Sequence, residues 1–297
     1  SPYGYIPARW LGILMLVLFV LTTILHFFQA IRYRMWFLVW TAVLAGILES
    51  LGWVGRLWAS YNVYSNTAFS MQIICTIIGP TPLIAANFII LGHVIRRLGQ
   101  QYSRLSARWY TIIFVSCDFI SLVVQALGGA AASAAVNNHK SAKGGSDIML
   151  AGIVFQTAAI TLYVILAAEF FLRYSYDWPI RGRTIIKTGY VFNKKMQQMV
   201  AALVFSSLCF YVRYVTHELG DGWEGRIIHT QRYFVIMDAL MIVLAMWTLN
   251  IFHPGHLLGY GVEWRADKNI VMQAVQSQDS EAAFGMLSGN GLPKEQY

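Results

Sequence analysis

The stretch Glu49-Ser-Leu-Gly-Trp-Val-Gly-Arg56 places two opposite charges at the end of a long apolar run. Glu49 and Arg56 are seven residues apart, with Gly52 and Trp53 between them, so all four share one helical face. A carboxylate in hydrocarbon is costly, and it usually faces the interior of a helix bundle or a water-filled cavity. The stretch therefore predicts a buried polar face on a membrane helix. That face serves either as a substrate or ion site, or as an internal Glu–Arg ion pair that fixes the helix.

The composition is that of an integral membrane protein. Of the 297 residues, 57% are hydrophobic and only 12% are charged, whereas a soluble domain carries about 25% charged residues. A helix needs about 20 apolar residues to cross the bilayer core. We expect an all-α, seven-helix transmembrane bundle, and a strand barrel is excluded because the runs do not alternate. The runs are Trp10–Ala30, Trp36–Leu57, Met71–Val94, Tyr110–Ala135, Ile148–Phe171, Met199–Val215 and Tyr233–Phe252.

The basic residues orient this bundle. Most of the 22 lysines and arginines follow odd-numbered runs, which predicts an outside N-terminus and a cytoplasmic C-terminus. Residues 1–258 then form the transmembrane domain, and the polar segment 259–297 is expected to be a mostly disordered cytoplasmic tail. The net charge of +8 is expected to face anionic lipid head groups at the cytoplasmic loops. No nucleic-acid-binding motif accompanies it.

The fourth apolar run carries a second polar face. Asp118 and Gln125 lie seven residues apart, with Ser121 between them, and this spacing places them on one side of a helix. The glycines that follow, Gly128 and Gly129, are typical of close helix packing. Asp118 is harder to explain by packing alone.

The third run contains a helix-breaking segment, Gly79-Pro-Thr-Pro82. Each proline lacks an N–H group, so the segment frees backbone carbonyls and kinks or breaks the helix. In a membrane such carbonyls must be satisfied by neighbouring helices or water, and the segment often lines a cavity. Asn87 follows in the same run.

The remaining candidate substrate-binding residues lie in or near the last three runs: Gln156, Arg213, Glu218 and Asp238. An aspartate at a helix centre costs about 3 kcal/mol on insertion scales, so three lipid-facing acids are improbable. We expect Glu49, Asp118 and Asp238 to share one interior cavity, with Gln125 and Asn87 on its inner side. The alternative is a salt-bridge cluster in which these groups simply pair with each other.

Enzyme chemistry finds little support in the sequence. No Gly-rich loop ending in Gly-Lys-Ser/Thr is present, so ATP hydrolysis is not indicated. His26, His93 and His253 lack ligand-type spacing, and we expect interfacial anchors rather than a metal site. The sequence predicts no cofactor and no catalytic residue. An intramembrane metal-dependent hydrolase stays open as a lesser alternative.

Several motifs together resemble the fungal lipid-translocating exporter family. They are Tyr-Ile-Pro7, Glu49-x-x-Gly-Trp-x-x-Arg56, Gly79-Pro80 with Ala85-Ala86-Asn87, Asp118-x-x-Ser-x-x-x-Gln125-x-x-Gly-Gly129, Ala151-Gly-Ile-Val-Phe-Gln156, Glu218 with Gly222-Trp-x-Gly225, Asp238-Ala and His253-Pro-Gly255. The match spans about residues 3–258. The chain departs from the family at Val215 and Gln231, where the family tends to carry an arginine and an acid.

This resemblance implies transbilayer movement or export of amphipathic lipids at the plasma membrane, with sphingoid long-chain bases as the leading substrate and a link to drug resistance. A cationic amine with hydroxyl groups suits a site that contains Glu49, Asp118 and Asp238. A seven-span receptor or sensor for such lipids is the alternative. Porphyrin or haem transport ranks lower.

Overall fold

The described part of the chain contains seven helices long and apolar enough to cross a membrane. The structure, a computed structural model, describes residues 5–138, 140–141, 143–180, 192–219 and 231–259. The spans are Arg9–Arg32, Val39–Tyr61, Asn66–Leu98, Ala107–Ala132, Lys143–Ser175, Lys194–Val215 and Gln231–Leu257. No strand occurs among these described residues, and the predicted seven-helix class is confirmed. The outside N-terminus stays a prediction.

Some spans are built from more than one helical element. The α-helices are α1 (Arg9–Arg32), α2 (Leu44–Tyr61), α3 (Asn66–Ile78), α4 (Pro80–Leu98), α5 (Ala107–Asn137), α6 (Lys143–Ser175), α7 (Lys194–Leu219), α8 (Gln231–Tyr233), α9 (Leu240–Ile251) and α10 (Pro254–Leu257). Two π-helical segments, η1 (Val39–Val43) and η4 (Phe234–Ala239), lead into α2 and α9, and a 3-10 turn, η2 (Gln100–Tyr102), follows α4.

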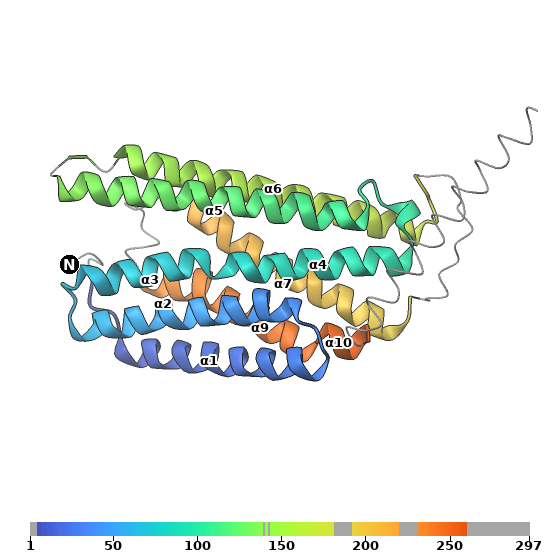
Figure 1. Cartoon of the computed structure of the whole chain (residues 1–297), viewed down its shortest axis with the longest axis horizontal. Coiled ribbons are helices and arrows are strands. Elements are labelled where there is room, and N and C mark those ends of the chain that lie inside the picture. The colour runs from blue at the N-terminus through green and yellow to red at the C-terminus, as the bar shows by residue number, and fades with distance from the viewer. Residues whose placement is uncertain (1–4, 139, 142, 181–191, 220–230, 260–297) are drawn as a thin grey trace, which may run out of the picture.

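The spans run along one common direction (Figure 1). The α5–α6 pair lies along one edge and the α1–α2 pair along the other, with the α3–α4 span between them and α7 and α9 behind. Because α4 is surrounded by neighbours, it is buried on nearly all sides. Its Phe88 packs against Phe114 of α5 and Tyr163 of α6, with ring centroids 5.4 and 4.7 Å away.

Glycines allow α5 and α6 to pack closely. A side chain at Gly128 of α5 would lie 2.8 Å from the Gly145 carbonyl oxygen of α6, and one at Gly152 would lie 3.0 Å from the Ser121 carbonyl oxygen. The Ser121 hydroxyl donates to the Gly152 carbonyl at 3.1 Å. Close packing was predicted for Gly128 and Gly129. It is confirmed at Gly128, whereas Gly129 faces open space.

The third span is divided at the predicted position. Gly79 separates α3 from α4 but keeps helical angles (φ −50°, ψ −48°), so α4 continues in the direction of α3. Pro80 and Pro82 fall in the first turn of α4, where their missing N–H groups leave little unsatisfied within α4 itself. The loss affects α3, because the Thr76 carbonyl oxygen would normally accept a hydrogen bond from the N–H group of residue 80.

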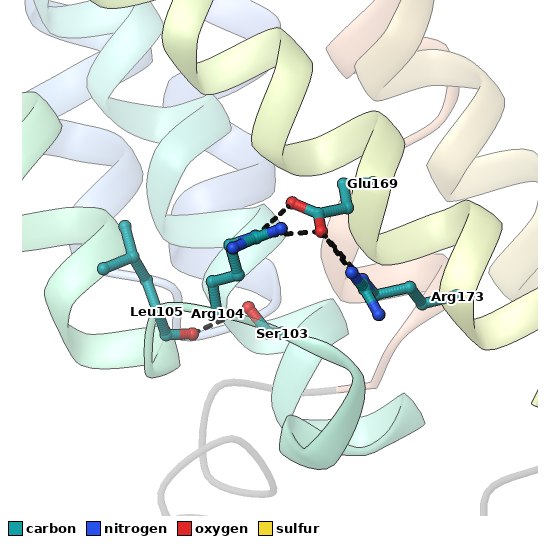
Figure 2. Close-up of polar contacts among 5 residues, drawn as sticks. All are labelled: Ser103, Arg104, Leu105, Glu169 and Arg173. Atoms are coloured by element: carbon teal, nitrogen blue, oxygen red, sulfur yellow. Dashed lines mark hydrogen bonds and ion pairs between the residues drawn. The ribbon is translucent and has the colours of Figure 1, made fainter. Parts of the chain in front are cut away.

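An ion-pair network fixes the segment between α4 and α5 against the end of α6. Figure 2 shows the Arg104 guanidinium reaching both carboxylate oxygens of Glu169, at 2.9 and 2.7 Å, while Arg173 reaches the same carboxylate at 2.8 Å. Close by, the Tyr102 hydroxyl donates to Asp177, and this hydrogen bond raises the pKa of Tyr102. The predicted tail beyond residue 259 and most of the basic 181–195 segment lie outside the described residues.

Candidate functional site

Arg213 of α7 is the centre of a buried charge cluster. Its side chain is 3% exposed, and its Nε donates to a carboxylate oxygen of Asp238 in η4, whose side chain is 8% exposed. Its Nη2 donates to the Thr76 carbonyl oxygen at 2.6 Å. This is the carbonyl that Pro80 deprives of its helical donor. One guanidinium therefore joins the broken third span to the seventh span.

Glu49 of α2 is the second acid of this cluster. The residue is 2% exposed and its charge interacts with those of Arg213 and Asp238. A side chain at Gly79 would lie 2.7 Å from the Glu49 Oε1 atom, so the glycine makes room for the carboxylate. Gly52, one turn along α2, contacts Thr76 of α3 in the same way.

The Glu49 carboxylate is attracted by the charge of Arg213 and repelled by that of Asp238. Asp238, in contrast, already pairs with Arg213. Two buried acids thus share one arginine, and the surplus negative charge falls on Glu49. A buried carboxylate in this state favours a bound cation or a proton.

A second polar network lies across α5, α6 and α7. The Gln156 side-chain amide donates to Asp118 Oδ1 at 2.5 Å and to the Tyr214 hydroxyl at 2.9 Å. Gln125 donates to the Gln156 Oε1 atom at 2.8 Å. Asp118 is 5% exposed, and its Oδ2 atom has no partner in the described part of the molecule.

The two networks meet on α7. Tyr214 directly follows Arg213, and the charges of Asp118, Asp238 and Glu49 all act on its phenol group. Sequence reasoning missed Tyr214, although its position beside a buried arginine was a usable signal. It also missed the Thr76 carbonyl, which the proline four residues later identifies.

The remaining predicted residues have separate surroundings. Asn87 of α4 donates to the Ser206 hydroxyl of α7 at 3.0 Å.

Arg56 donates to the Tyr5 hydroxyl at 2.9 Å and to Gln72 Oε1 at 3.4 Å. The Glu49–Arg56 ion pair considered from the sequence stays a prediction. The charges found to act on Glu49 are those of Arg213, which attracts it, and of Asp238, which repels it. The Arg56 guanidinium also lies against the Phe234 ring, 4.8 Å from the ring centroid.

Glu218 falls in the last turn of α7, and its side chain lies outside the described part of the structure. The three histidines occupy helix contacts. His26 of α1 bonds the Met246 carbonyl oxygen at 3.2 Å, and His253 stacks on Tyr33 with ring centroids 4.8 Å apart. His93 is fully buried in α4. No group of three or more His, Cys, Asp or Glu residues within the described ranges could hold a metal ion.

Comparison with known proteins identifies the family. The model described as "RTA1 like protein" matches residues 42–260. The chain belongs to this RTA1-like family. The match includes Glu49, Asp118, Arg213 and Asp238, and it agrees with the resemblance to lipid-translocating exporters seen in the sequence motifs. No solved structure matches this RTA1-like chain.

Named relatives of this RTA1-like protein are fungal. The sphingoid long-chain base transporter of Saccharomyces cerevisiae is 31% identical over 283 residues, covering 85% of this chain and 73% of the relative. The lipid-translocating exporter-like protein of Leptosphaeria maculans is 25% identical over 275 residues, covering 87% and 52%. The protoporphyrin uptake protein of Saccharomyces cerevisiae is 26% identical over 210 residues, covering 69% and 65%.

Proposed function

We propose that this RTA1-like protein moves amphipathic lipids with a cationic head group between bilayer leaflets at the plasma membrane. Sphingoid long-chain bases are the leading substrates. The observation that carries the proposal is the cluster of Glu49, Asp238 and Arg213, in which two buried acids share one arginine. The transporter named among its relatives supports the same substrate class.

In this proposal the protonated amine of the lipid pairs with Glu49, a buried carboxylate that competes with Asp238 for the single charge of Arg213. The polar stripe of Asp118, Gln125 and Gln156 receives the hydroxyl groups. The acyl chain remains among the apolar spans. A charge-assisted hydrogen bond of this kind contributes about 1.5–3 kcal/mol, which favours an amine over a neutral alcohol of equal length.

The same charges argue against a porphyrin as the main substrate. A porphyrin with propionate groups brings carboxylates toward Glu49 and Asp238, and Arg213 is already paired. A lipid receptor and an intramembrane hydrolase are competing functions for a seven-span bundle. Translocation is favoured over both by the relative that is named as a sphingoid long-chain base transporter.

At the helix ends, the proposal includes contact with anionic lipid head groups. Arg104 and Arg173 share the single carboxylate of Glu169, so a net positive charge remains there. Arg104 is 59% exposed. Such a group is attracted to an anionic membrane surface.

Reconstituted vesicles test the proposal. The full chain in phosphatidylcholine vesicles should speed the leaflet exchange of a fluorescent sphingoid base. Its N-acetylated analogue, which lacks the cation, should move no faster than in protein-free vesicles. Equal acceleration of both lipids would contradict a site selective for the amine, and no acceleration of either would contradict translocation.

A further inference from the structure

A second buried polar cluster lies between α1 and the α9–α10 region, away from Glu49. It comprises His26 and Gln29 of α1, and Asn250 and His253 at the end of the seventh span. His26 is 0%, Asn250 6% and His253 2% exposed. Each of the four residues has one buried polar atom without a hydrogen-bond partner in the described part of the molecule: His26 Nδ1, Gln29 Oε1, Asn250 Oδ1 and His253 Nε2.

Hydrogen bonds connect α1 to the end of the seventh span at this cluster. The Gln29 side chain donates to the Asn250 carbonyl oxygen at 2.9 Å, and the Asn250 side chain donates to Thr22. His26 bonds the Met246 carbonyl oxygen, one turn before Asn250. His253 follows Asn250 by three residues.

The hydrogen bonds fix which free atoms accept and which donate. A carbonyl oxygen can only accept, so His26 carries its proton on Nε2 and Nδ1 is an acceptor in the neutral ring. His253 Nδ1 accepts from the Gly255 N–H at 3.1 Å, so Nε2 is a donor. With the two amide oxygens, the cluster offers three acceptors and one donor.

Such a set suits a ligand that is rich in hydrogen-bond donors. Leaving four buried polar atoms without partners is costly. An aminodiol head group presents three ammonium N–H groups and two hydroxyls, which satisfy the acceptors, while a hydroxyl oxygen can accept from His253. An anionic head group would meet three acceptors and is disfavoured.

We propose that this cluster is a second head-group site for the sphingoid base, nearer the α10 end of the bundle. The inference rests on the proposed function, because it assigns the same substrate a second position. Asp238 and Asn250 are twelve residues apart along η4 and α9, which corresponds to about 18 Å along the helix axis. The head group therefore has one site on each side of the bundle centre.

Photo-crosslinking maps these sites in the full chain, held in phosphatidylcholine nanodiscs. The probe is a sphingoid base with a diazirine on the carbon next to the aminodiol. Crosslinked peptides should fall in two groups, one around Glu49, Arg213 and Asp238 and one around residues 26–29 and 250–253. Unlabelled sphingoid base should compete with both groups, and a fatty alcohol of equal length should not.

Two variants test the chemistry of the second site. Gln29→Met removes an acceptor and should weaken crosslinking of the second group about threefold to tenfold, the range for one lost hydrogen bond. Asn250→Asp adds a carboxylate and should strengthen it. Thr248→Val is the matched control, because the Thr248 hydroxyl bonds the Leu244 carbonyl oxygen of its own helix. Thermal midpoints of all variants identify any that are misfolded.

The outcomes separate the two proposals. Crosslinks confined to the first group, with translocation intact, would overturn the second site and leave the proposed function standing. If neither variant changed the second group, the cluster would hold ordered water alone and the second site would be overturned. Loss of both groups together with absent translocation would overturn the proposed function as well.

Discussion

Arg213 holds three separate elements together with a single side chain. It belongs to α7, pairs with Asp238 of η4 and bonds the Thr76 carbonyl of α3. Burying an ion pair does not by itself stabilise a protein, because desolvation offsets the attraction. Removing one partner is different, since it leaves an uncompensated charge.

A double-mutant cycle measures this coupling. Arg213→Leu should destabilise the protein by about 3–5 kcal/mol, because Asp238 loses its partner in a buried site. Adding Asp238→Leu should restore part of that loss. The free energy of unfolding in detergent checks both values. A double variant whose loss of stability equals or exceeds the sum of the two single losses would mean that the pair does not link α7 to the seventh span.

The broken third span is the element that gives this site its shape. Gly79 leaves room for Glu49, and Pro80 frees the Thr76 carbonyl for Arg213. Gly79 contributes because it has no side chain, and Pro80 contributes because it has no backbone N–H group. The break therefore connects a sequence motif directly to the charge cluster.

Replacing Pro80 by alanine tests the role of the break. Gly79 already has helical angles, so an N–H at position 80 can reach the Thr76 carbonyl and compete with Arg213. We expect Pro80→Ala to lower the translocation rate while the thermal midpoint stays equal or rises. The leaflet-exchange assay and a melting curve in detergent measure these two quantities.

Pro82→Ala is the control for that experiment. It makes the same change two residues later, where the restored N–H faces the Ile78 carbonyl rather than Thr76. Its translocation rate should match that of the parent protein. Equal loss of translocation in both variants would mean that Arg213 and Thr76 are not the cause.

At the scale of the whole molecule, the distribution of basic residues in the sequence predicts how the bundle is oriented in the membrane. The outside N-terminus predicted from the basic residues puts the segment between α2 and α3 outside and the end of α6 in the cytoplasm. Tyr64 and Trp178 are 77% and 72% exposed in these two places. Their similar exposure makes them a matched pair for labelling.

Single cysteines at these positions test the orientation. In a background without Cys75, Cys117 and Cys209, an impermeant maleimide on intact cells should label Tyr64→Cys and spare Trp178→Cys. Permeabilised cells should label both. The reverse pattern on intact cells would place the N-terminus in the cytoplasm.

The seven spans follow from the sequence, but the pairing of their polar residues does not. Apolar length specifies each span, and two prolines locate the break in the third. Periodicity places Glu49 and Arg56 on one face of α2, yet it cannot show that packing turns Arg56 toward Tyr5 and Phe234. The Arg213–Asp238 pair joins two helices, so only their relative rotation reveals it.

The central claim is that Glu49 binds the cationic head group of the transported lipid. Glu49→Gln keeps the size of the side chain and removes its charge. We expect leaflet exchange of the sphingoid base to fall about tenfold to hundredfold, the factor for one charge-assisted hydrogen bond. Glu169→Gln, which neutralises an acid at the end of α6, is the matched control and should keep the parent rate. Unchanged exchange in Glu49→Gln would contradict this role for Glu49.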